Sequence, residues 1–191
     1  MNHKFNLSLM LDKYEFKVNR NEDVDKILMN PSDNIQNIHL NLSGATSPLD
    51  QNKFGELFSK LKNLKNFERV HLDLTKYPID DEKISTIGDS LVSLQNLKEL
   101  HLHVSDINFS DPQFKNMLKP LKSKESIEKL HLVMENVNMN FYKRKKIEKL
   151  MNSLPNLKFV HINVKRNNLT QEDLGDLHKI LFHRPYRELI W

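Results

Sequence analysis

The sequence predicts an α/β fold in which one β-strand and one α-helix alternate along the chain. A phrase of eight residues occurs five times, and the histidine at its fifth position recurs at spacings of 32, 30, 30 and 30 residues. Inside each phrase apolar and polar residues alternate, which is the period of a strand with one buried face. Apolar residues at helical spacing follow and predict an amphipathic helix packed on the strands. The phrases occupy residues 35–42, 67–74, 97–104, 127–134 and 157–164, and a shorter sixth copy covers 186–191.

Each predicted helix begins at a residue type that caps helix N-termini. The side chains of Ser, Thr, Asp and Asn accept hydrogen bonds from the free amides of the first helical turn. Such residues form one column of the repeat, and apolar columns follow it. The capping column is Asp50, Asp80, Ser110, Asn140 and Thr170, and one apolar column is Leu57, Ile87, Met117, Ile147 and Leu177. The sequence therefore predicts helices that begin at these capping residues.

A unit of about 30 residues with one strand and one helix cannot bury its own apolar face, and stacking of successive units solves this. The phrase Leu97-Lys98-Glu99-Leu100-His101-Leu102 resembles the L-x-x-L-x-L motif of leucine-rich-repeat proteins, and the long unit is similar to their ribonuclease-inhibitor-like class. The resemblance covers residues 34–191. It implies a solenoid, a horseshoe segment of five full repeats plus a terminal strand, with a parallel β-sheet on the concave side and helices on the convex side.

The chain departs from that family at one position of the repeat. An asparagine usually follows the strand there, and in this chain only Asn167 matches it. The other repeats carry Ala45, Tyr77, Ile107 and Val137.

Residues 1–33 do not follow the repeat and are predicted to cap its first unit. Apolar residues alternate in residues 5–9 and again in 14–18, which predicts a β-hairpin, and residues 22–29 are expected to form a short helix. Such a cap would cover the apolar end of the first repeat. At the other end Trp191 closes an uncapped strand. A partner subunit, self-association or fraying of a short end are the alternatives for that edge.

Composition and motifs point away from catalysis. The chain has no cysteine, which excludes disulfides, thiolate zinc sites and cysteine nucleophiles. It has no Gly-x-Ser-x-Gly, no glycine-rich phosphate loop and no His-Glu-x-x-His. We therefore expect a protein that is not an enzyme, has no cofactor and takes no small-molecule substrate. No apolar run approaches the ~18 residues of a membrane span, and no signal peptide is visible, which favours an intracellular location.

The predicted function is that of a non-catalytic scaffold for protein–protein interaction, or an accessory subunit of a larger assembly. Protein partners are expected to bind the concave sheet surface, where the side chains that alternate with the buried ones should point. Mixed polarity with one exposed aromatic residue suits a protein surface better than a uniform phosphate track. The predicted surface consists of Arg69, His71, Asp73, Glu99, His101, His103, Lys129, His131, Phe159 and His161.

The recurring histidine should form a row on this surface, with neighbours separated by ~4.8 Å. The row is His39, His71, His101, His131 and His161. The simplest interpretation is a copied residue on a solvated face that holds no metal. The alternative is a zinc site, because zinc takes three or four such ligands. Its candidate ligands are His71, Asp73, His101, His103 and His131. In either case we expect binding on this surface to respond to pH near ~6.5.

A basic run lies at the start of the fourth predicted helix. It consists of Lys143, Arg144, Lys145 and Lys146, and Lys and Arg outnumber Asp and Glu by 16 to 10 in residues 101–191. Cations at a helix N-terminus oppose the helix dipole, so local stability does not explain them. One interpretation is a solvated helix face. The other gives the alternative function, a nucleic-acid-associated protein that uses this basic C-terminal flank and loses affinity steeply with salt.

Overall fold

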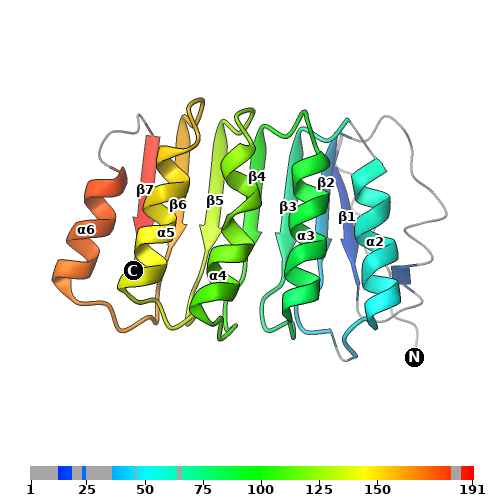
Figure 1. Ribbon diagram of the computed structural model, residues 1–191, viewed down its shortest axis with the longest axis horizontal. Helices are drawn as coiled ribbons and strands as arrows, with labels where there is room; N and C mark the ends of the chain where they lie inside the picture. Colours follow the sequence, from blue (N-terminus) through cyan, green and yellow to red (C-terminus); the bar gives the residue numbers. More distant parts are fainter. Residues whose placement is uncertain (1–12, 19–22, 25–35, 46, 64–65, 182–185) are drawn as a thin grey trace.

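The computed structural model describes residues 13–18, 23–24, 36–45, 47–63, 66–181 and 186–191. They form a seven-stranded sheet in which all neighbours are parallel and the strand order follows the sequence. The last six strands alternate with helices, so the fold is α/β with successive βαβ units (Figure 1). The strands are β1 (Lys13–Lys17), β2 (Asn37–Asn41), β3 (Arg69–Asp73), β4 (Glu99–His103), β5 (Lys129–Val133), β6 (Phe159–Asn163) and β7 (Tyr186–Ile190).

The labelled helices all lie against one face of the sheet (Figure 1). They are α2 (Gln51–Asn63), α3 (Asp81–Ser93), α4 (Asp111–Leu118), α5 (Phe141–Asn152) and α6 (Gln171–Leu181), and the 3₁₀ helix η1 (Pro120–Ser123) follows α4. Each of the five capping residues accepts a hydrogen bond from the amide three residues later, at 2.8 to 3.3 Å. The predicted helix starts are therefore confirmed.

The core lies between the sheet and the helices. From β2 to β6 the second and fourth residues of each strand are at most 3% exposed, and the other three are only partly buried or exposed. One continuous register places His39 opposite His71 and His71 opposite His101, and the pairing continues to β6. Because side chains alternate across a strand, this register puts every buried column on the helix side. The period-two prediction is confirmed for these five strands.

Asn167 and Tyr77 stand at the same place in their units and hold equivalent turns. The buried Asn167 accepts hydrogen bonds at its Oδ1 from the amides of Val137 (2.9 Å) and Met139 (3.1 Å) in the preceding unit. The hydroxyl of Tyr77 accepts one from the amide of Leu49 (2.9 Å), which is the counterpart of Met139. The tyrosine therefore accepts one of the two hydrogen bonds that the asparagine accepts, although in the sequence it stands only as a departure from the family pattern.

The two ends of the sheet differ in how far they match expectation. β1 covers the second strand of the predicted N-terminal hairpin and joins the sheet in parallel with β2, in continuous register. The first strand of that hairpin and most of the predicted helix at 22–29 lie outside the described residues. β7 confirms the predicted last strand, and the Trp191 side chain directly after it is 59% exposed.

Candidate interaction face

One face of the sheet carries no helix in the described part of the chain, and we call it the helix-free face. The first, third and fifth residues of each strand point to it, and the strand register aligns them in three columns. The columns are Asn37, Arg69, Glu99, Lys129 and Phe159; His39, His71, His101, His131 and His161; and Asn41, Asp73, His103, Val133 and Asn163. Every residue predicted from the sequence for the binding surface lies in these columns.

The histidine column forms a continuous run of ring contacts. His39 stacks on His71 and His101 on His131, each pair with ring centroids 3.8 Å apart and planes within 8° of parallel. Between the two pairs, the ring centroids of His71 and His101 are 5.3 Å apart. The ring centroid of His161 lies 5.6 Å from that of His131. Strand spacing of ~4.8 Å would separate identical rings evenly. The rings therefore tilt into pairs and do not form a uniform ladder.

Glu99 is the centre of a small ion-pair network on the same face. Its Oε1 accepts a hydrogen bond from His101 Nε2 at 2.6 Å, and its Oε2 lies 3.0 Å from Arg69 Nε and 3.4 Å from Lys129 Nζ. A carboxylate only accepts, so the proton of this bond sits on the imidazole nitrogen. Burial raises the pKa of Glu99, but the His101 hydrogen bond and the charges of Arg69, His101 and Lys129 outweigh it and lower that pKa.

Two imidazoles of this face, those of His103 on β4 and His131 on β5, resist protonation. Burial lowers the pKa of His131 to about 4, and the neighbouring His101 adds to this effect. Burial also lowers the pKa of His103, although the charge of Asp73 opposes it. Both rings are therefore neutral at pH 7, and for these two the charge change expected near pH 6.5 occurs at lower pH.

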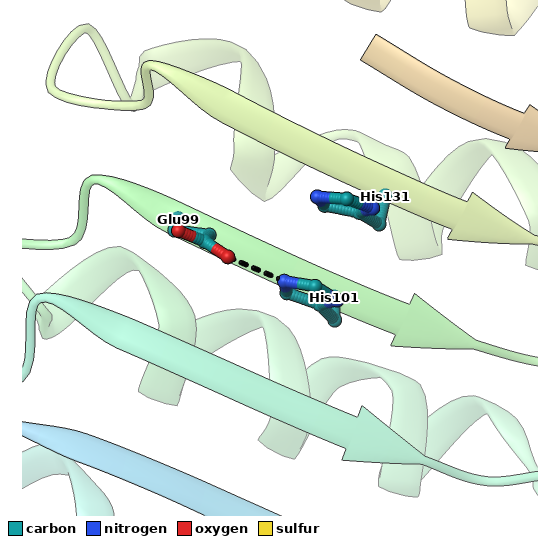
Figure 2. Close-up of side chains that lie close together, drawn as sticks. All are labelled: Glu99, His101 and His131. Atoms are coloured by element: carbon teal, nitrogen blue, oxygen red, sulfur yellow. Dashed lines mark hydrogen bonds and ion pairs between the residues drawn. The ribbon is translucent and has the colours of Figure 1, made fainter. Parts of the chain in front are cut away.

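The asparagine and aspartate residues of the third column bond to the turns that follow their strands. Asp73 Oδ1 accepts a hydrogen bond from the amide of Thr75 (2.9 Å), and Asn163 Oδ1 accepts one from the amide of Lys165 (3.1 Å). Such bonds from a side chain to the amide two residues later form Asx turns. Asp73, a candidate metal ligand in the sequence, is thus a turn former. Among the described residues the possible ligand atoms that converge belong to Glu99, His101 and His131 (Figure 2).

The β6 end of the face combines an aromatic ring with a paired histidine. The Phe159 ring lies 4.9 Å from the ring of His131. His161 Nδ1 lies 2.8 Å from an oxygen of the exposed Glu188 on β7. Glu188 was not among the predicted residues, because the sixth copy as aligned from the sequence places Ile190 at the histidine position. The structure shifts this register by two residues and pairs Glu188 with His161.

The predicted basic flank is divided between buried and exposed side chains. Lys143 is 1% exposed, and its Nζ donates hydrogen bonds to the carbonyls of Val137 (2.9 Å) and Asn138 (3.0 Å). Arg144 is buried too and forms an ion pair with Asp173 on α6. Both residues therefore make contacts inside the protein that the sequence did not predict. Their ammonium and guanidinium groups bind protein atoms, which removes them from a surface that could contact phosphates.

The remaining two cations of that run reach solvent but have contacts within the protein. Lys145 Nζ lies 2.8 Å from Glu148, and Lys146 Nζ lies over the Tyr142 ring at 4.1 Å from its centroid. A pocket of about 270 Å³ opens beside Lys145, between α5 and α6. Its charges are also paired, since Lys179 Nζ lies 3.3 Å from Asp176. No concentration of free positive charge forms among these pocket residues.

Comparison with known proteins adds two findings. No protein-family model matches the chain, and no curated protein is significantly similar to it in sequence. In the described residues, none of the helices has the length and apolar character needed to cross a bilayer.

Proposed function

We propose that the chain is a leucine-rich-repeat solenoid of the ribonuclease-inhibitor-like class that serves as a non-catalytic scaffold for protein–protein interaction or as an accessory subunit of a larger assembly. Its partner is a protein, which binds the helix-free face. The observation that carries this proposal is the alignment of three side-chain columns across five adjacent strands, on a face that no described helix covers. Stacked repeats use such broad sheet faces for binding.

Contacts between successive units support the solenoid. Asn167 bonds backbone groups of the unit before it, and Lys124 Nζ donates to the carbonyls of Val92 (3.0 Å) and Leu94 (2.6 Å) in the preceding unit. Each strand pairs only with the strands before and after it in sequence. Strand pairing limited to nearest neighbours is typical of repeat proteins.

The charge pattern favours a protein partner over nucleic acid. Arg69 and Lys129 flank Glu99 on the helix-free face, so positive and negative charges alternate along the column. The residues just before the strands alternate in the same way, with Lys98 paired to Glu68 and Lys158 paired to Glu128. Phosphate binding requires unneutralised cations. Phe159 adds an aromatic side chain of the kind enriched at protein interfaces.

Affinity purification with two matched variants tests the proposal. The tagged chain is recovered from its own cells at low and at moderate salt, and the eluate is analysed by mass spectrometry and a nucleic-acid assay. One variant changes the helix-free face (Lys129→Ala with Phe159→Ala), and the other changes the exposed helix side (Lys145→Gln with Lys146→Gln). We expect a defined set of proteins at both salts with the wild type and with the helix-side variant. The face variant should lose that set.

Two results would overturn the proposal. The first is a set of partners that the face variant retains and the helix-side variant loses. The second is recovery of nucleic acid at low salt only, without a protein set that depends on the face. Because phosphate contacts weaken steeply with ionic strength, the second result would favour the nucleic-acid alternative.

A further inference from the structure

We propose that Glu99, His101 and His131 form a binding site for one divalent transition-metal ion of the zinc class. Each residue offers one ligand atom, and the three atoms lie within 4.8 Å of one another. Glu99 and His101 are on β4 and His131 is on the adjacent β5, as Figure 2 shows. The site goes beyond the scaffold function and does not depend on it.

An ion fits after the side chains rotate, because the ligand atoms are now up to 4.8 Å apart and the rings of His101 and His131 are stacked. Zinc bonds to imidazole nitrogen and carboxylate oxygen are ~2.0 to 2.2 Å long, so two ligand atoms of one ion lie at most ~4.3 Å apart. The Glu99–His101 pair is already joined through a proton at 2.6 Å. On metal binding that proton leaves Nε2 for Nδ1, and the Nε2 lone pair turns to the ion. The His131 ring, now stacked on His101 at 3.8 Å, turns its own nitrogen to the same point.

Two of the three ligands, Glu99 and His131, carry the protonation states that metal binding requires. Metal ligands must be neutral imidazoles or ionised carboxylates. The lowered pKa of His131 keeps its ring neutral at pH 7, and the lowered pKa of Glu99 keeps it ionised. Two imidazoles with one carboxylate suit zinc, and they leave a fourth position open for water or a ligand from outside.

The positive charges of Arg69 and Lys129 repel an ion bound beside Glu99, and removing either charge tests where the ion binds. Arg69 and Lys129 contact Oε2 of Glu99, whereas His101 contacts Oε1. Oε1 is therefore the oxygen available to an ion on the histidine side. Like charges repel over these distances, so both cations reduce the affinity for a metal. Removing either charge should tighten binding, whereas removal of a ligand should weaken it.

Calorimetric titration of the full chain with ZnCl₂ tests the site, after chelator treatment and at about pH 7.5. We expect one ion per chain, with affinity reduced at least about ten-fold in His101→Gln, His131→Gln and Glu99→Gln. Co²⁺ added in place of zinc should give absorption bands that the two histidine variants lose. Lys129→Gln should bind zinc several-fold more tightly. His178→Gln, an exposed histidine on α6, is the matched control and should bind as the wild type does.

The proposal is overturned if the wild type binds no zinc, or if the His101→Gln and His131→Gln variants bind it as tightly as the wild type. Circular dichroism of each variant reports whether it is folded. If the histidine variants fail to fold, the zinc affinity of Lys129→Gln still tests the site. The Lys129 side chain is half exposed, so we expect this variant to fold. Unchanged zinc affinity in a folded Lys129→Gln protein places the ion elsewhere and rejects the site.

Discussion

The side chain of Asn167 satisfies backbone groups of two successive units at once. Besides accepting from the amides of Val137 and Met139, its Nδ2 donates to the carbonyls of Met134 (2.7 Å) and Val164 (2.8 Å). Buried backbone groups that lose a partner cost the full desolvation penalty. One residue therefore fixes the turn between β5 and α5 as well as the turn after β6.

We expect Asn167→Ala to lower the free energy of unfolding by about 2 to 6 kcal/mol, since two buried amides lose their acceptor at about 1 to 3 kcal/mol each. Chemical denaturation followed by circular dichroism measures this. The control is Asn116→Ala at an exposed position of α4, which should change stability by less than about 0.5 kcal/mol. Equal effects of the two substitutions would contradict the role of the Asn167 hydrogen bonds.

The titration of His131 should be visible in the pH dependence of stability. In the unfolded chain a histidine binds its proton near pH 6.5, whereas in the folded protein His131 does so only at about 4. Between these values the unfolded state binds more protons, so the free energy of unfolding falls as the pH falls through this window. In chelator-containing buffer, the wild type should lose more stability than His131→Gln between about pH 7.5 and about pH 4.5. Parallel pH curves for the two proteins would show that His131 is not shifted.

Two side chains show why some of the candidate site could not be read from the sequence. Lys143 and Arg144 look like surface residues in any polarity pattern, yet their long aliphatic stems cross apolar layers and their charged ends reach carbonyls or Asp173. Arg144 ends on Asp173 of the next unit, whereas Lys143 ends on carbonyls of the turn just before its own helix, and a polarity pattern shows neither partner. The helix-free columns were predictable because strand alternation alone determines them.

At the scale of elements, Gly88 and Pro120 explain how α3 packs beside the end of α4. Pro120 lacks an amide hydrogen and stops α4, so the chain continues as the short helix η1. Gly88 lies in α3 where an added Cβ would come within 2.6 Å of Pro120 Cγ. The absence of a side chain at Gly88 therefore permits this close approach.

We expect Gly88→Ala to destabilise the protein by about 1 to 2 kcal/mol, because overpacking outweighs the gain in helix propensity. The matched control is Gly175→Ala in α6, where an added Cβ meets no atom within 4 Å. That control should stabilise the protein by up to about 1 kcal/mol. Thermal and denaturant unfolding of the two variants measure the difference. Equal stabilisation by Gly88→Ala and Gly175→Ala would show that Pro120 moves away from the added Cβ without a loss of stability.

The helices and most strands could be predicted because their signals are local. A capping residue and an apolar stripe determine where each helix begins, and Asp80, Ser110 and Asn140 all cap as expected. The pairing of β1 with β2 could not be predicted in this way. Tyr14 lies 24 residues before its partner Ile38, whereas the repeat has a period of about 30 residues. The repeat pattern therefore does not align Tyr14 with Ile38.

At the scale of the whole molecule, the strand order makes each unit depend on its neighbours. Strands β2 to β6 each pair with one strand on either side, and these are always the preceding and following strands in sequence. The hydrogen bonds of Asn167 also join only adjacent units. Stability in such an arrangement is the sum of unit and interface contributions, so a local loss should remain local.

Amide hydrogen exchange of Asn167→Ala tests this locality. We expect faster exchange in β5, α5 and β6, which the Asn167 contacts join, and exchange close to the wild-type rate in β2 and β3. The physical reason is that opening near Asn167 breaks the interfaces between adjacent units there but leaves the pairing of β2 with β3 intact. A uniform increase in exchange from β2 to β7 would instead mean that the sheet opens as one cooperative unit, and it would remove this support for a solenoid.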